Sequence, residues 1–445
     1  MMQAVRDLFW DTLVRRDRSL DLINSLNDEN KAAILEQLNH SSVKKWIDEN
    51  IDIKRIANLR VSFPDAVTSI TCMGFACQAN DVSTVCQLLA AGADTSVTRS
   101  DGATLLHLAC SSTKDAREKV QRLLDANPAL VNSRNDNNST PLHVTSTVGK
   151  VDVMDVLLDH GADVNAQGGP YGRTALHNVA ALGNVGCIHA LMKRGADVNS
   201  RDVERGVMAL HLAATFKHND CMKVLINDYG ASVNATEDLT KNIALHSAAT
   251  VGNLDGINIL TSHTQCDIEA RNLNNKTPLH VACEKGFVDC SRVLLQRGAD
   301  VDAVAVNNWT ALQLATYYKH DKCAKMLIEE FDAAINSAAD NGYTALHTAA
   351  WQGSFGMVKI LAAYYDCDVS IKDAYGRTAA ALARAYKHDE IAQFLEKKRY
   401  GKCDPHLLQV NLNFFNGDKI TLVFYRIFAR FDMRLPPAFA VNRNF

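Results

Sequence analysis

The chain has 445 residues, of which 47% are hydrophobic and 22% charged, and its formal net charge is −3. This balance excludes a wholly disordered chain and provides no overall field that would hold nucleic acid or an anionic membrane. By length the chain would form two or three ordinary domains, unless it is a repeat array that grows without a single core.

The N-terminal residues and the cysteines both indicate an intracellular protein. Residues 1–20 carry acids and arginines where a signal peptide needs a continuous apolar run, and the chain has no stretch of about 18 apolar residues. The 12 cysteines are scattered and include no C-x-x-C pair, which is typical of reduced thiols. We therefore expect a cytoplasmic or nuclear location and no transmembrane segment.

Residues 1–66 are predicted to form helices. The stretch NDENKAAILEQL offers an Asn or Asp cap before an apolar stripe, and HSSVKKWIDEN offers a Ser cap ahead of Trp46 and Ile47. Such helices would cover the exposed apolar face of the first unit of a repeat array. The alternative is an independent docking module.

A seven-residue motif recurs from the second quarter of the chain onward. Its copies are TLLHLAC at Thr104, TPLHVTS at Thr140, TALHNVA at Thr174, MALHLAA at Met208, IALHSAA at Ile243, TPLHVAC at Thr277, TALQLAT at Thr310, TALHTAA at Thr344 and TAAALAR at Thr378. The successive offsets are 36, 34, 34, 35, 34, 33, 34 and 34, and a degenerate copy, TCMGFAC, begins at Thr71. A fixed period of this length indicates a solenoid.

One period predicts a helix, a turn, a second helix and a projecting β-turn. Leu279 and Ala282 lie on one apolar stripe of a short helix, and Val288 and Leu294 lie on the buried face of a second. The glycine in RGAD and HGAD is placed where a helix ends in the left-handed conformation. No unit can bury its apolar faces alone, so the units must stack.

This lettering and period resemble the ankyrin repeat family over residues 67–400, with about ten units. The resemblance implies an all-α ankyrin-repeat solenoid that binds a partner protein on its concave face. It also implies that the contact residues lie one position before each motif and seven and eight positions after the motif start.

Seven of the 15 histidines occupy the fourth motif position: His107, His143, His177, His211, His246, His280 and His347. One interpretation is that these histidines form a row of metal ligands. Units stacked about 8–10 Å apart cannot share one ion, because zinc holds its ligands within about 2.1 Å. We therefore predict that each imidazole hydrogen-bonds the backbone of a β-turn.

Four cysteines occur 13 residues after their motif start: Cys187, Cys221, Cys290 and Cys323. They are expected to share one buried helix position. Disulfides need Cα atoms closer than about 7 Å, so neighbouring units cannot pair them.

Catalytic, metal and cofactor motifs are not found in the sequence. It has no H-E-x-x-H, no G-x-S-x-G, no phosphate-binding loop and no paired-cysteine zinc spacing, and GGPYGR at residues 168–173 is predicted to be a turn. We expect no enzymatic activity and no cofactor.

Large aromatic side chains concentrate in three units at positions that the repeat leaves free. Both tryptophans of the array, Trp309 and Trp351, fall in such positions. Aromatic residues are typical of interaction hot spots because they bury much area at small entropic cost. The predicted partner-binding residues are Trp309, Tyr317, Tyr318, Tyr343, Trp351, Tyr375, Lys276 and Arg377. The alternative is that these rings pack on each other or under the C-terminal segment.

Two asparagines are candidates for modification by resemblance alone. The segments containing Asn165 and Asn199 are similar to ankyrin sites that an oxygen-sensing asparaginyl hydroxylase modifies. The alternative is that both side chains only shape a turn.

Residues 401–445 contain seven of the 15 phenylalanines and no copy of the motif. VNLNFFNGDKITLVFY predicts a β-hairpin around Asn416 and Gly417. These phenylalanines would cover the last unit, the aromatic face or a partner.

The sequence thus favours a monomeric, non-catalytic scaffold or adaptor that binds another protein. Two alternatives stay open. The array is the substrate-selecting part of a longer ubiquitin ligase or kinase, or residues 401–445 attach it to a membrane or to RNA.

Overall fold

The computed structural model describes residues 58, 60–62, 69–79 and 81–400, so most of the predicted cap region and the predicted C-terminal hairpin lie outside the described residues. The described part is an array of paired helices. Its elements are β1 (Arg60–Ser62), β2 (Ser69–Thr71), α6 (Cys72–Ala79), α7 (Val82–Ala90), α8 (Leu105–Ser111), α9 (Ala116–Ala126), η1 (Pro128–Asn132), α10 (Pro141–Val148), α11 (Val151–Asp159), α12 (Ala175–Leu182), α13 (Val185–Lys193), α14 (Ala209–Thr215), α15 (Asn219–Asn227), α16 (Ala244–Val251), α17 (Leu254–Ser262), α18 (Pro278–Lys285), α19 (Val288–Gln296), η2 (Val306–Asn308), α20 (Ala311–Tyr317), α21 (Asp321–Phe331), α22 (Ala345–Trp351), α23 (Phe355–Ala363), α24 (Ala379–Ala385) and α25 (Asp389–Tyr400).

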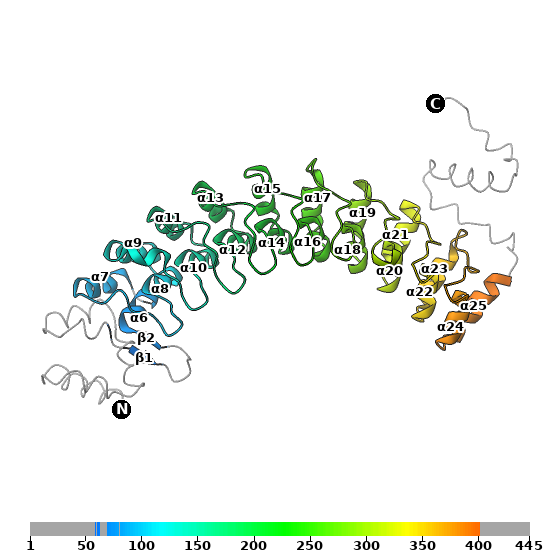
Figure 1. The fold of residues 1–445 in the computed structure, drawn as a ribbon, viewed down its shortest axis with the longest axis horizontal. Helices are drawn as coiled ribbons and strands as arrows, with labels where there is room; N and C mark the ends of the chain where they lie inside the picture. The colour runs from blue at the N-terminus through cyan, green and yellow to red at the C-terminus, as the bar shows by residue number, and fades with distance from the viewer. Residues whose placement is uncertain (1–57, 59, 63–68, 80, 401–445) are drawn as a thin grey trace, which may run out of the picture.

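The helices form two layers of one arch (Figure 1). The even-numbered helices from α6 to α24 open the units and line the inner, concave layer, and the odd-numbered helices from α7 to α25 form the outer layer. A turn projects from the inner layer before each motif (Figure 1). We call this turn the finger; in the unit at Thr310 it comprises residues 304–309, closed by a bridge between Val304 and Thr310. The predicted solenoid is confirmed.

The ends of each helix follow from particular residues. In the unit at Thr277 the threonine caps α18, and Pro278 occupies the first turn, where its missing N–H is not needed. The helix stops at Gly286, whose φ of 77° is the left-handed conformation of a C-terminal cap. The chain then turns directly into α19, so the two helices of a unit lie antiparallel.

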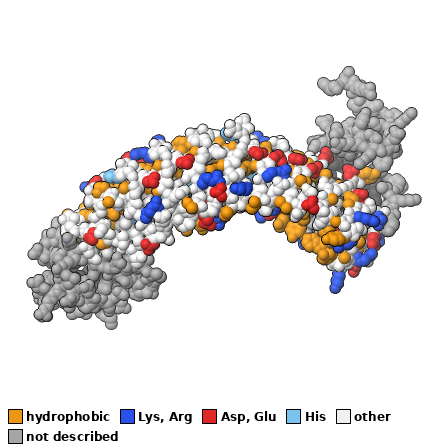
Figure 2. Space-filling view, in the orientation of Figure 1, with side chains coloured by type: hydrophobic (Ala, Val, Ile, Leu, Met, Phe, Trp, Pro, Cys, Tyr) orange, Lys and Arg blue, Asp and Glu red, His pale blue; other side chains and the backbone are white. Residues whose placement is uncertain are grey.

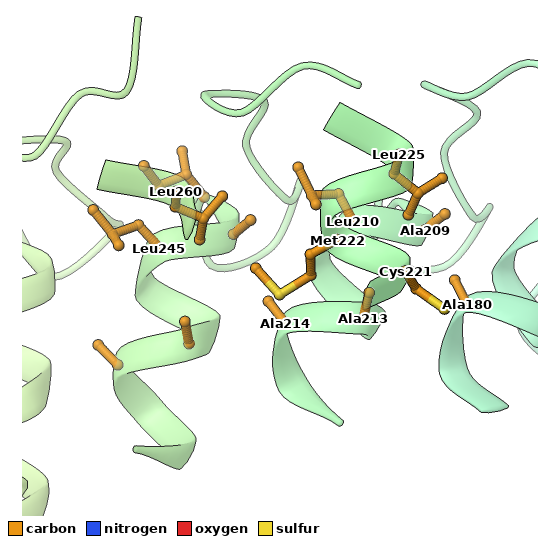
Figure 3. Close-up of a cluster of buried hydrophobic side chains, with 14 of the residues drawn as sticks. Ala180, Ala209, Leu210, Ala213, Ala214, Cys221, Met222, Leu225, Leu245 and Leu260 are labelled. Carbon is orange, nitrogen blue, oxygen red and sulfur yellow. The ribbon is translucent and has the colours of Figure 1, made fainter. Parts of the chain in front are cut away.

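The core runs through the helix pair of each unit and across the interfaces between neighbouring units. Leu210 of α14 and Met222 and Leu225 of α15 are completely or almost completely buried. Cys221 of α15 points toward Ala180 of the preceding unit, and Met222 lies on the side that faces Leu245 of the next unit (Figure 3). Small residues such as alanine let the inner helices approach closely, so each interface is densely packed.

The predicted helical region 1–66 is wrong at Arg60–Ser62, which form β1. This strand pairs antiparallel with β2, with Val61 opposite Ile70. Both central residues are β-branched, which favours a strand, and Pro64 disfavours a helix between them. The strand pair leads directly into α6, so the tenth unit predicted at Thr71 is confirmed by the helix pair α6 and α7.

From α10 to α24, the inner helices end in the left-handed conformation with one of two residue types. Glycine occupies this position at Gly149, Gly183, Gly252, Gly286 and Gly353, and lysine occupies it at Lys217, Lys319 and Lys387. The four last glycines face a ring of the next unit; a Cβ at Gly286, for example, would lie 2.5 Å from Nδ1 of His320. Lysine in this conformation costs about 1 kcal/mol relative to glycine, so the three lysines are locally strained.

Candidate functional site

Each motif histidine joins its helix to the following turn through both ring nitrogens. Nδ1 of His280 accepts from the backbone N–H of Thr277 at 3.2 Å and contacts the Thr277 hydroxyl at 2.8 Å, while Nε2 donates to the carbonyl of Trp309 at 3.2 Å. The other Nε2 bonds join His107 to Ser139, His143 to Arg173, His177 to Val207, His211 to Ala235, His246 to Lys276 and His347 to Arg377. The predicted backbone-locking role is confirmed.

These imidazoles are neutral in the folded protein. Burial lowers the pKa of His211, His246 and His280 to about 4, although the hydrogen bonds to backbone carbonyls oppose that shift. Within the described residues, no group of three or more histidine, cysteine or acidic side chains could hold a metal ion. The hydrogen bonds of these histidines hold the backbone of the fingers in position.

The four cysteines at the shared helix position are buried, as predicted. All the described cysteines are free thiols. Burial raises the pKa of Cys187 and Cys221 to about 11, so both stay protonated and unreactive at neutral pH. They pack as small apolar side chains.

The histidine bonds also fix the backbone of the predicted contact residues in the fingers. The carbonyls of Lys276, Trp309 and Arg377 accept from His246, His280 and His347. Gln313 replaces the histidine in the unit at Thr310, where its Nε2 donates to the carbonyl of Tyr343 at 2.7 Å. The same hydrogen bond thus holds the backbone of four candidate residues at equivalent positions of successive fingers. Their side chains are therefore regularly spaced along the concave face.

Five rings form one continuous ring cluster on α20, α22 and α24 and the finger before α20: Trp309, Tyr317, Tyr318, Trp351 and Tyr386. Tyr317 lies at its centre, with centroids 5.5 Å from Trp309, 5.0 Å from Tyr318 and 6.2 Å from Trp351. Trp351 meets Tyr386 edge to face at 6.2 Å. Hydrophobic side chains gather on this part of the inner surface (Figure 2).

The ring cluster is partly open to solvent. Tyr318 and Tyr386 are 45% and 50% exposed, and Trp309, Tyr317 and Trp351 are half-buried. Backbone bonds hold it from both sides, because His388 donates to the carbonyl of Trp351 and Gln352 donates to the carbonyl of Tyr317. The backbone positions of two of its rings are therefore fixed, and the rings contact one another.

Tyr343, Tyr375 and Arg377 form a separate group. The Arg377 guanidinium bonds Asp373, donates to the Tyr343 hydroxyl at 3.2 Å and lies 4.8 Å from the Tyr375 ring centroid. Tyr343 also stacks on His347 at 5.8 Å. Tyr375 is 77% exposed at the tip of its finger. Arg377 thus contacts two tyrosines, and the Asp373 carboxylate already pairs with its guanidinium.

Lys276 is also engaged within the chain, since its ammonium bonds the Glu284 carboxylate. Glu284 pairs with Lys285 as well, at 3.2 Å. One carboxylate thus serves two lysines at the finger side of α18. The predicted site therefore divides into the ring cluster, the arginine-centred group and this ion-paired edge.

Sequence reasoning placed Tyr386 at a contact position, eight residues after Thr378, but did not include it among the site residues, and it missed Lys319 and Lys387. An aromatic-Lys-His sequence ends three inner helices, at Phe216–His218, Tyr318–His320 and Tyr386–His388. Lysine at the left-handed position is unusual, and the recurrence of this triplet was the signal that could have found the residues.

A recess lies between the fingers near the start of the array, on the concave side. It is lined by small or polar side chains, including Ser139, Thr147 and Asn178, with Tyr171 beside Arg173. It offers a partner less apolar surface than the ring cluster does. The GGPYGR segment at this recess is a turn, as predicted, with Gly168 and Arg173 bridged.

Asn165 and Asn199 are exposed and bridge neighbouring units. The side-chain oxygen of Asn165 accepts from the backbone N–H of Asp197 at 2.8 Å, and that of Asn199 accepts from Ser232 at 2.9 Å. These bonds match the turn-shaping alternative, and hydroxylation of the two residues stays a prediction.

The described helices include none with the length and apolar character needed to cross a bilayer.

Sequence models of ankyrin repeats match most of the array. A three-copy model matches residues 72–168, 113–202, 176–272 and 245–339, and a many-copy model matches residues 327–383.

Several curated proteins are similar to parts of the chain. The tyrosine-protein kinase HTK16 of Hydra vulgaris is 30% identical over 29% of this chain and 17% of its own length. The nuclear factor NF-kappa-B p105 subunit of Gallus gallus is 32% identical over 46% and 21%, and the E3 ubiquitin-protein ligase XBAT32 of Arabidopsis thaliana is 29% identical over 27% and 29%. The chain spans less than a third of each of these relatives.

Proposed function

Because the chain belongs to the ankyrin repeat family, whose arrays are protein interaction modules, we propose that it is a non-catalytic scaffold or adaptor that binds a partner protein on its concave face. The ring cluster supports this proposal most directly. Its rings lie at positions that the stacking of helices does not require, and they stay partly exposed. Large, fixed aromatic surfaces carry much of the binding energy of protein interfaces.

The ring cluster predicts where the partner binds. Replacing both tryptophans, Trp309→Ala with Trp351→Ala, should weaken binding of an affinity-purified partner at least roughly thirtyfold, because an anchor ring commonly contributes about 2 kcal/mol. The unfolding midpoint should stay within a few degrees, since both rings are half-buried rather than core residues.

Ser139→Ala with Thr147→Ala is the matched control for this experiment. Ser139 and Thr147 hold the same two repeat positions as Trp309 and Trp351, one before and seven after a motif start. The control should bind as the wild type does. Normal binding by a tryptophan variant that unfolds early would assign the rings to the core and move the interface elsewhere.

A second function is favoured by the names of two relatives, a kinase and a ubiquitin ligase. In it the array is the substrate-recognition part of a longer polypeptide. The same ring cluster would then select the substrate, and a catalytic domain would follow or precede it. Sequencing the full-length transcript distinguishes the two, because the second requires a catalytic domain in the same reading frame.

A further inference from the structure

Two lysines flank the ring cluster at equivalent places. Lys319 directly follows Tyr318, and Lys387 directly follows Tyr386, at the left-handed ends of α20 and α24. Both side chains are exposed. The folded array accepts glycine at this position in five other units, so its backbone does not require a lysine here.

Unlike Lys276, Lys285, Arg377 and Arg384, these two lysines have no ion pair within the described part of the chain. Lys276 and Lys285 pair with Glu284, Arg377 pairs with Asp373, and Arg384 pairs with Glu396 at 2.9 Å. Beside the ring cluster, Lys319 and Lys387 thus each carry a positive charge that no carboxylate of the described residues pairs with. An acidic partner would meet complementary charge there.

We propose that the ring cluster binds an extended acidic peptide segment, with a large apolar side chain on the rings and carboxylates at Lys319 and Lys387. This proposal rests on the proposed function and specifies the chemistry of its partner. The two lysines belong to units two steps apart, roughly 16–20 Å along the array at 8–10 Å per unit. An extended chain covers that distance in about five or six residues.

Other occupants fit these observations less well. Residues 401–445 of this chain carry six Lys and Arg against three Asp, so they would bring like charge to both lysines. Single-stranded nucleic acid is held by a continuous row of cations along its backbone, whereas this surface has two unpaired lysines separated by one unit.

The test is a selection from a displayed random library of peptides of about twelve residues, twice the calculated span, with the full chain as bait. Selected peptides should carry two acidic residues five or six positions apart with a large apolar residue between them. Binding of the best peptide should fall roughly two- to thirtyfold in Lys319→Gly with Lys387→Gly, because two exposed charge contacts are removed. Glycine suits the left-handed conformation, so this variant should fold at least as well as the wild type.

Lys217→Gly is the matched control, because Lys217 ends α14 in the same conformation and the same aromatic-Lys-His sequence, outside the ring cluster. It should bind the peptide normally. Each of the following would overturn the proposal: selected peptides without acidic residues, no enrichment over a bait-free control, equal binding by the double lysine variant, or tighter binding of a synthetic 401–445 peptide or a single-stranded RNA oligonucleotide. If the tryptophan variant still loses its purified partner in that case, the proposed function stands and only the acidic chemistry fails.

Discussion

Each motif histidine uses both ring nitrogens, so its fit to the folded array depends on the neutral imidazole. In the unfolded chain these side chains take up a proton near pH 6.5, whereas His211, His246 and His280 stay neutral in the folded array until about pH 4. The unfolded state therefore binds more protons between these values. The free energy of unfolding is unaffected by these groups above about pH 6.5 and falls as the pH decreases toward 4.

This linkage predicts the effect of His280→Gln. Gln313 already occupies the motif position in one unit, with Oε1 accepting from the Thr310 N–H at 2.8 Å and Nε2 donating to Tyr343. The glutamine variant should keep near-normal stability at pH 7 and lose one histidine's contribution to the pH dependence, about 1.4 kcal/mol per pH unit. Denaturant unfolding measured at several pH values between 4 and 7 gives this slope.

His280→Ala is the comparison variant. It loses the bonds to Thr277 and Trp309, each worth roughly 1 kcal/mol, and should be less stable at every pH above 5. Added zinc should leave the melting temperature of the wild type unchanged. A zinc-dependent rise that the alanine variant abolishes would contradict the hydrogen-bonding role.

At the end of an inner helix, the next unit limits which residue can occupy the left-handed position. Gly286 is covered by the His320 ring, which is itself held by a bond to the Glu284 carbonyl at 2.9 Å. Lys319 occupies the equivalent place one unit later, where the next unit presents Ser354 instead of a ring. At these two helix ends, the space for a side chain therefore depends on the N-cap residue of the next outer helix.

Two substitutions at these ends should have opposite effects. Gly286→Ala puts a Cβ both into a left-handed backbone and against the His320 ring, so we expect a loss of at least about 2 kcal/mol. Lys319→Gly relieves the same backbone strain and should gain up to about 1 kcal/mol. Equilibrium unfolding of the two variants measures both signs, and an unchanged Gly286→Ala protein would mean that the ring moves aside at little cost.

Much of this architecture could be predicted because each repeat unit is encoded by a short, contiguous stretch of sequence. The Thr and His positions indicate where each inner helix begins, and the structure follows them. The strand at Arg60–Ser62 depends on pairing with a second segment, which a helical pattern does not reveal. Likewise, the separation of Tyr343 and Arg377 from the ring cluster depends on contacts with Asp373 and His347, which no spacing rule predicts.

At the scale of the whole molecule, stability is a sum of similar interfaces between adjacent units. The described arch has no central core, and each helix pair packs on the pair before and the pair after it (Figure 1). A unit in the middle therefore supports two interfaces, whereas the unit of α24 and α25 packs on one other described unit.

Equivalent leucines test this arrangement. Leu260 of α17 and Leu395 of α25 each lie 17 residues after a motif start and are buried to the same degree. Leu260→Ala should lower the main unfolding transition by about 2–5 kcal/mol. Leu395→Ala should leave that transition nearly unchanged and speed amide exchange only in α24 and α25. Hydrogen exchange with mass spectrometry separates these outcomes, and global destabilisation by both variants would indicate a single cooperative unit.

The Nε2 protons of the seven motif histidines, from His107 to His347, have a further use. Each is buried and hydrogen-bonded to a carbonyl of the following turn, so it exchanges slowly with water and gives its own downfield signal in a proton NMR spectrum. The array thus contains a built-in spectroscopic probe in seven of its units, with a gap at the unit of Gln313. The order in which these signals vanish on warming would record where the arch opens first, without any label added to the protein.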